Sequence, residues 1–437
     1  MRFNLDFLRL VREIRKLGRD ERGHVAVIFT LLLVPLIGLT GGAIDYTRAS
    51  AAKVAMQAAL DATALALSKE AANLTQAQLT QKAHDYFLAA FNRPDAYDVK
   101  VNATYSNAAG STVVISSSSV VKSHFLGILG IDQMNISSST MTKWGTKRLR
   151  VALALDVTGS MASNNKLSTM KTATKSLIDE LKSVATNPGD VYISIIPFNK
   201  DVNAGPSNHA SSWIRWDLWD AQNGSCAGHS HGNPSSKNSC KSRGGTWTAA
   251  DHSTWNGCVM DRDQNYDTTN TEPTNNATRF PAEQFSSCPE PLMGLSNDWN
   301  ALTQKIDDLT ATGNTNQTIG LQWAYQSLTA NSPLTVPAKD PLYKYEDAII
   351  LLTDGMNTEN RFTSSQSSID NRMQAACNNV KAANITVYTV LVMAGNASLL
   401  QNCASSSSKY FYLTSPDQLI ATFNTIATEL SQLRLAK

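Results

Sequence analysis

The sequence predicts a protein of the α/β class, in which a doubly wound, mostly parallel sheet carries a disulfide-containing insertion. A transmembrane helix and a small α+β region precede this sheet. Two observations predict the sheet. The runs that begin at Val151 and Val191 (VALALDV and VYISIIPF) are continuously apolar, as in strands buried on both faces. Such runs alternate with helical patterns over residues 149–437, which is typical of a doubly wound parallel sheet.

The first 44 residues predict a membrane anchor. Residues 1–23 form a basic segment, with seven Lys/Arg against four Asp/Glu before Gly23. The uncharged run VAVIFTLLLVPLIGLTGGAI at 25–44 is long enough for a helix to cross about 30 Å of hydrocarbon. We therefore expect a transmembrane helix over 24–44, a cytoplasmic N-terminus and an exported remainder. A cleaved secretory signal is the alternative, although its apolar region is usually shorter.

Residues 45–148 predict a helix followed by a small antiparallel β region. The Ala-rich run after the anchor and the pattern up to about Phe91 are helical, and Pro94 ends them. Apolar residues then alternate over 97–145 around a turn at 107–110, which indicates antiparallel strands. The Ala-rich helix could assemble with similar helices or act as a rigid spacer, and the sequence does not separate these alternatives.

Residues 203–298 interrupt the α/β pattern and predict an insertion. Four of the six cysteines lie there, and an even number in an exported chain suggests disulfides whose connectivity stays open. The four are Cys226, Cys240, Cys258 and Cys288. Cys377 and Cys403 flank one strand pattern and are a plausible further pair. Trp213, Trp216 and Trp219 recur every third residue, and either pack inside the insertion or face a ligand.

Three loops place oxygen-bearing side chains at one edge of the predicted sheet. Asp156, Thr158 and Ser160 follow the first strand, Asp354 follows the strand AIILLT, and Thr315 precedes a helix. Ligands of open α/β sheets bind at the carboxyl ends of the strands. An all-oxygen set of this kind suits Mg²⁺ best here, with Mn²⁺ or Ca²⁺ as alternatives. The same Asp and Ser could instead cap the helix that follows.

These motifs carry a family resemblance. DVTGS at 156–160, GNT at 313–315 and TDG at 353–355 together resemble the metal-ion-dependent adhesion site (MIDAS) of von Willebrand factor type A domains, which have a Rossmann-like fold. The resemblance covers about 151–202 and 299–437. It implies that Asp156, Thr158, Ser160, Thr315 and Asp354 hold a divalent cation, Asp354 often through water. It also implies a protein partner whose acidic side chain completes the coordination of the cation.

The N-terminal part carries a second resemblance. RDERGHVAVIFTLLLVPLIGLTGGAIDYTRASAAKVAMQAALDATALA, from Arg19, is similar to the start of TadG-like proteins of the Tad (Flp) pilus assembly system. The order of anchor, pilin-like helix, small β region and type A domain is similar as well. The resemblance implies a single-pass protein of the bacterial inner membrane whose C-terminal region is periplasmic or extracellular. Its partners would be pilus-assembly components or a surface ligand.

Other functions find less support. The net charge of +2 gives no field that favours nucleic acid. Val157 interrupts the D-T-G-S of aspartic proteases, so we expect no enzymatic activity and keep a hydrolase as a remote alternative. The main alternative to adhesion is a structural scaffold of a pilus or secretion assembly, in which the metal only stabilises the loops. A second possible calcium site lies at Asp261, Asp263, Asn265 and Glu272, where the glycine of a standard calcium loop is replaced by Tyr266.

Overall fold

The computed structural model describes residues 21–437 except 108–109, 145–146, 331 and 436–437. The chain forms two compact units, Met1–Trp144 and Gly145–Lys437. The division lies close to the expected boundary at 148/149. Nearly all of the predicted basic segment 1–23 lies outside the described residues.

The N-terminal unit contains one long helix, a second helix and a three-stranded sheet. Its elements in chain order are α2 (Glu21–Leu67), η1 (Ala71–Asn73), α3 (Gln76–Ala90), β1 (Ala96–Ser106), β2 (Ser111–Lys122), η2 (Leu126–Leu129) and β3 (Gln133–Trp144). The strands pair antiparallel in the order β1-β2-β3. This arrangement confirms the small α+β region expected after the apolar helix. Helix α2 contains Pro35 and is long and apolar enough to cross a membrane.

The C-terminal half of α2 and helix α3 pack on one face of this sheet. In β2 every second residue is buried, as the alternating pattern predicts. The buried apolar side chains of α2 recur at helical spacing and are Ala49, Ala52, Met56, Ala59, Leu60, Ala64 and Leu67. Helix α3 begins with a capping box between Thr75 and Gln78 and contributes Leu79, Ala83 and Phe87 to the same core.

The C-terminal unit is built on an eight-stranded sheet. Its main strands are β4 (Lys147–Asp156), β5 (Val191–Phe198), β13 (Lys344–Thr353), β14 (Thr386–Val392) and β15 (Tyr410–Leu413). The strand order is β10-β6-β5-β4-β13-β14-β15, and β4, β5, β13, β14 and β15 pair in parallel. At the β5 edge the short strands β6 (Val202–Asn203), β10 (Cys258–Val259) and β12 (Met293–Ser296) pair antiparallel. The predicted doubly wound, mostly parallel sheet is therefore confirmed.

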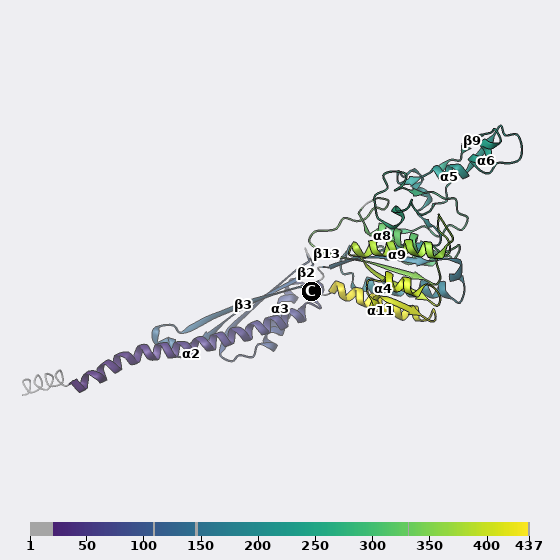
Figure 1. Ribbon diagram of the computed structural model, residues 1–437. Coiled ribbons are helices and arrows are strands. Elements are labelled where there is room, and N and C mark those ends of the chain that lie inside the picture. Colours follow the sequence, from purple (N-terminus) through teal and green to yellow (C-terminus); the bar gives the residue numbers. More distant parts are fainter. Residues whose placement is uncertain (1–20, 108–109, 145–146, 331, 436–437) are drawn as a thin grey trace, which may run out of the picture. The chain divides into compact units, whose positions relative to one another are not determined.

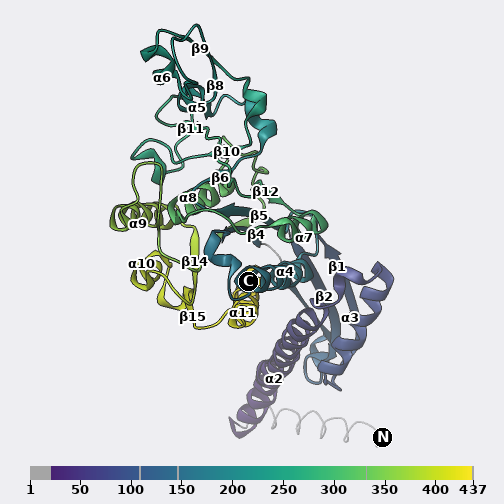
Figure 2. The same cartoon turned by 90° about the vertical axis from the view of Figure 1, so that its right-hand side faces the viewer.

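Helices cover both faces of this sheet. Helices α8 (Gln317–Leu328), α9 (Gln366–Ala382) and α10 (Ala397–Cys403) lie on one side, and α4 (Lys166–Val184), α7 (Trp299–Asp308) and α11 (Gln418–Leu435) lie on the other (Figures 1 and 2). The side chains of β4 alternate between the two cores. Ala152 and Ala154 face α8, whereas Val151, Leu153 and Leu155 belong to the cluster under α4 and α11.

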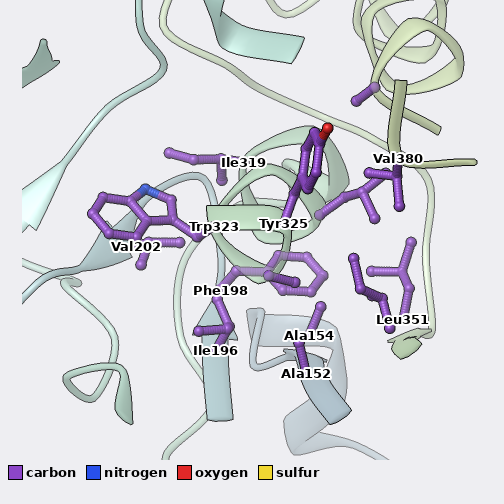
Figure 3. Packing of buried hydrophobic residues seen from close by; sticks show 14 of the residues in the cluster. Ala152, Ala154, Ile196, Phe198, Val202, Ile319, Trp323, Tyr325, Leu351 and Val380 are labelled. Atoms are coloured by element: carbon purple, nitrogen blue, oxygen red, sulfur yellow. The ribbon is translucent and has the colours of Figure 1, made fainter. Parts of the chain in front are cut away.

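Helix α8 is buried along its whole length because the insertion covers its outer side. Gly320 allows the close approach of α8 to the sheet, since a Cβ there would lie 2.4 Å from the Phe198 ring. Gln322 and Gln326 donate hydrogen bonds to the carbonyl of Thr269 in the insertion. Figure 3 shows side chains of α8 packed over the sheet, namely Ile319, Trp323 and Tyr325 above Ala152, Ala154, Ile196 and Phe198.

The insertion itself consists of short elements held by disulfides. Besides β10 and β12, its elements are η4 (Pro206–Ala210), β7 (Ile214–Arg215), α5 (Asp217–Gln222), β8 (Gly224–Ala227), α6 (Lys237–Ser242), β9 (Thr246–Ala249), η5 (His252–Thr254), η6 (Tyr266–Thr268) and β11 (Phe280–Pro281). The structure pairs Cys226 with Cys240 and Cys258 with Cys288, and outside the insertion it pairs Cys377 with Cys403. Within the insertion, Trp216 lies edge-on to Trp219 and is stacked on His252, whereas Trp213 packs edge-on against Trp323 of α8. The part that carries α5, α6 and β9 projects away from the sheet (Figure 1).

Candidate functional site

Three loops meet at the carboxyl end of β4 and β13. The backbone N–H of Gly159 donates to the carbonyl of Gly313 at 3.0 Å, and the N–H of Thr312 donates to the carbonyl of Val157 at 2.7 Å. Gln317, at the start of α8, donates to the carbonyl of Gly355 at 2.9 Å. Backbone and side-chain hydrogen bonds therefore hold the loops at 156–160, 312–318 and 353–355 against one another.

The Asp156 carboxylate lies at the centre of this site and has no exposed surface. Its Oδ1 accepts the backbone N–H of Thr158 at 2.9 Å, and its Oδ2 accepts the hydroxyl of Thr353 at 2.6 Å. Thr353 was not among the residues expected from the sequence. Its position before Asp354 on a strand that neighbours β4 is the signal that could have identified it.

A chain of hydroxyl groups leads from the first loop to Asp354. The hydroxyls of Thr158 and Ser160 lie 3.0 Å apart, and Ser160 donates to Oδ1 of Asp354 at 2.6 Å. Asp354 is also buried. The structure thus brings together four of the five predicted site residues.

Thr315, the fifth predicted residue, lies in the third loop, where its backbone bonds to Thr358. Its N–H donates to the hydroxyl of Thr358 at 2.8 Å, and its carbonyl accepts the N–H of Thr358 at 2.9 Å. The next residue but one, Gln317, donates to the Thr353 hydroxyl at 3.1 Å. Thr315 is 5% exposed and lies in the loop whose Gly313 carbonyl binds the first motif.

Lys166 is a site residue that the sequence analysis missed. Its ammonium group donates to Oδ2 of Asp354, and the lysine is 7% exposed. Lys166 is the first residue of α4, where the helix dipole disfavours a cation. Asn164 and Asn165 precede it in the left-handed region, at φ 55° and 58°, a conformation that asparagine tolerates. A lysine in the first turn of this helix was the signal that could have identified it.

The electrostatics of the site fit a bound cation. Burial, and secondly the nearby negative charge of Asp354, raise the pKa of Asp156 to about 6, although the hydrogen bonds from Thr158 and Thr353 act in the opposite direction. Among the described residues, no group of three or more His, Cys, Asp or Glu side chains is gathered to hold a metal ion. A cation held here would therefore depend on hydroxyl as well as carboxylate oxygens, which suits a hard divalent ion.

The raised pKa of Asp156 predicts a pH dependence for cation binding. In the metal-free protein the folded state favours the protonated Asp156 carboxyl. Its contribution to the free energy of unfolding is fully present below the ordinary pKa of 3.8 and is lost as the pH rises through about 6. A cation requires the ionised form, so binding must displace a proton below pH 6. We expect the affinity for Mn²⁺ to fall about tenfold per pH unit below 6, as measured by Mn²⁺ titration between pH 5 and 8. An affinity that is constant across this range would contradict the prediction.

The residues of the possible calcium loop serve other contacts. Asp263 accepts from Arg215 at 2.9 Å and from Arg361 at 2.7 Å, and the side-chain amide oxygen of Asn265 accepts from Arg372 at 3.0 Å. Asp261 accepts the side-chain amide of Asn316 at 2.8 Å and the backbone N–H of Arg361 at 3.2 Å, and Glu272 is exposed. These contacts hold the insertion to the α/β core, so we propose no calcium loop there.

Two family models match parts of this chain. The von Willebrand factor type A domain model matches residues 266–425, a range that includes Thr315 and Asp354 but not Asp156. The C-terminal unit is therefore a von Willebrand factor type A domain. The Flp pilus-assembly TadE/G-like model matches residues 23–72. The chain thus combines a TadE/G-like segment of the Tad pilus system with a type A domain, and its apolar N-terminal helix fits a membrane-anchored protein.

No curated protein sequence matches this chain. Among solved structures, it is similar to the pilus adhesin SpaC from Lactobacillus rhamnosus GG, at 13% identity and a TM-score of 0.37, over 78% of this chain and 35% of that chain. The vWF domain of the type V pili tip protein Mfa5 from Porphyromonas gingivalis matches at 12% identity and a TM-score of 0.38, over 67% of this chain and 97% of that chain. Proximal thread matrix protein 1 from the mussel byssus, with a zinc-occupied MIDAS motif, matches at 15% identity and a TM-score of 0.33, over 66% of this chain and 46% of that chain. This chain spans about a third of the length of SpaC.

Proposed function

We propose that this chain is a membrane-anchored component of Tad/Flp-type pilus assembly or adhesion that binds protein partners through a metal-ion-dependent adhesion site. Residues 25–44 anchor it in a bacterial inner membrane, with a cytoplasmic N-terminus and a periplasmic or extracellular C-terminal region. The TadE/G-like match and the length of the apolar helix support this placement.

The observation that carries the binding proposal is the meeting of two buried carboxylates with a chain of hydroxyls at the sheet edge. Asp156, Thr158, Ser160, Thr315 and Asp354 would hold the cation, and Mg²⁺ fits these oxygen ligands best. When bound, the cation supplies a positive centre that an acidic side chain of a protein partner can reach. Within the chain, Ser160 and Thr353 hold the carboxylates of Asp354 and Asp156 in position by hydrogen bonds.

A substitution of Asp156 tests the metal site. We expect the full chain in detergent to bind one Mn²⁺, and Asp156→Ala to lower the affinity at least about 100-fold because a charged ligand is lost. Binding is measured by electron paramagnetic resonance of free Mn²⁺. Asp307→Ala is the matched control. Asp307, on helix α7, is exposed and pairs with Lys175 of helix α4 at 2.7 Å.

Ser160→Ala serves as a second variant in case Asp156→Ala does not fold. Full Mn²⁺ binding by both folded variants would contradict the metal site. If binding is lost but partner capture is unchanged, the metal only stabilises the loops and the scaffold alternative stands. Deletion of 147–437 separates these functions further, because a scaffold that acts through α2 still supports pilus assembly. Turnover of peptide or phosphate substrates by the wild-type chain would instead favour a hydrolase.

A further inference from the structure

The turn between β2 and β3 exposes an unusual number of large apolar side chains. The segment 123–132 has the sequence SHFLGILGID. Ile128, Leu129 and Ile131 expose 69%, 57% and 48% of their surface, and Phe125 exposes 37%. Turns between strands are more often polar, and clustered exposed apolar side chains mark an interaction surface. We call this segment the apolar turn.

The apolar turn packs against the part of α2 that belongs to the proposed anchor. A Cβ added at Gly41 would lie 2.4 Å from the Cβ of Phe125, and one at Gly42 would lie 3.1 Å from Leu126. A Cβ at Gly38 would lie 3.5 Å from Leu129, which is ordinary contact. The glycines of the helix therefore provide the space that the turn occupies.

The position of these contacts along α2 gives their depth. Residues 25–44 span about 30 Å at 1.5 Å per residue, which matches the hydrocarbon core. Gly38 precedes the end of this run by six residues, so it lies about 9 Å inside the hydrocarbon boundary. Because Leu129 contacts Gly38, the apolar turn must reach a similar depth if the helix crosses the bilayer.

The backbone of the apolar turn is also prepared for a lipid environment, where unpaired N–H groups are costly. The carboxylate of Asp45, which is 2% exposed, accepts the N–H groups of His124, Phe125 and Leu126 at 2.7–3.1 Å. The N–H groups of Ile128, Gly130 and Ile131 bond to carbonyls within the turn. Leu126, Leu129 and Met134 line an open apolar pocket together with residues of α2, namely Pro35, Gly38, Leu39, Gly42 and Tyr46.

We propose that the apolar turn inserts into the outer leaflet beside α2 and that lipid acyl chains cover Ile128, Leu129 and Ile131. The sheet of the N-terminal unit is then held at the membrane by two elements instead of one. This inference rests on the proposed anchoring of α2. It adds a lipid-binding surface that the anchor alone does not imply.

Site-directed fluorescence tests this inference on the full chain reconstituted in vesicles of phosphatidylethanolamine and phosphatidylglycerol. All six native cysteines are disulfide-bonded, so single introduced cysteines can be labelled. The label is placed at Ile128→Cys, with Met141→Cys as the matched control. Met141 is equally exposed, at 66%, but lies in β3 far from the turn. We expect lipid-borne doxyl quenchers to quench the label at position 128 at least about threefold more strongly than at 141, and aqueous iodide to do the reverse.

A third label at Leu36→Cys, which is 62% exposed on α2, separates this inference from the anchor. If position 36 is quenched by lipid and position 128 by iodide, the apolar turn lies in water and the inference fails while the anchor stands. If both are quenched by iodide, the anchor fails too. Protection of position 128 from both quenchers would mean that a second protein chain covers the turn, which also overturns the lipid proposal. Gly41→Ala should move the turn and reduce lipid quenching at 128, whereas Gly38→Ala should not.

Discussion

Replacing Lys166 with methionine is expected to raise the affinity of the chain for Mg²⁺ about 100-fold. The Lys166 ammonium and a divalent cation compete for the same carboxylate, because Lys166 is bonded to Oδ2 of Asp354 and both side chains are buried. Removing one partner of a buried ion pair costs about 3–5 kcal/mol, since the other charge is left uncompensated. A bound cation would restore the missing positive charge. If about 3 kcal/mol is recovered in this way, the dissociation constant falls about 100-fold.

Calorimetric titration of the full chain with MgCl₂ measures this change. Thermal unfolding in EDTA should show that the metal-free Lys166→Met variant is less stable than the wild-type protein, and excess Mg²⁺ should remove most of the difference. Lys171→Met is the matched control. Lys171 lies on the same helix, but its ammonium donates to the exposed carbonyl of Asp307 at 2.8 Å. An unchanged or weaker affinity in Lys166→Met would show that the lysine does not compete with the cation.

Replacing Trp323 with alanine is expected to cost about 3–5 kcal/mol and to loosen the insertion. Trp323 has no exposed surface and joins the α/β core to the insertion. Its ring centroid lies 4.4 Å from that of Phe280 and 6.1 Å from that of Trp213, and both of these residues belong to the insertion. The indole therefore packs against two insertion residues at once, and a small side chain cannot make both contacts.

Urea unfolding followed by circular dichroism measures the loss of stability, and limited trypsin digestion with mass spectrometry locates the loosened segment. Cleavage within 203–298 should accelerate more than cleavage elsewhere in the unit. Trp299→Ala is the control, because Trp299 is only partly buried and packs on the opposite face of the sheet. Equal cleavage of the insertion in both variants would contradict the proposed role of Trp323.

Much of the fold could be predicted because its signals are local. The apolar runs of β4 and β5 and the alternation in β2 are read directly from neighbouring residues. The motifs at the ends of two parallel strands predicted the meeting of Asp156, Ser160 and Asp354, since parallel strands deliver their carboxyl ends to one edge.

The rest depends on contacts between distant parts of the chain. The Lys166–Asp354 pair joins residues 188 positions apart, and helical periodicity says nothing about such a pair. The acidic residues at 261 and 263 have calcium-loop spacing, but the arginines that engage them come from 215 and 361. The sequence predicts the apolar turn only as part of the β region. Its partners in α2 lie about 80 positions earlier in the chain, so local patterns do not reveal the contact.

The unbroken course of α2 has a mechanical consequence. About 23 residues of this helix, or about 35 Å, continue past Ile44 as part of the core of the N-terminal unit. If its first half crosses the bilayer as proposed, no hinge separates the lipid-embedded part from the three-stranded sheet. A pulling load on the sheet would pass straight into the anchor as tilt or torque.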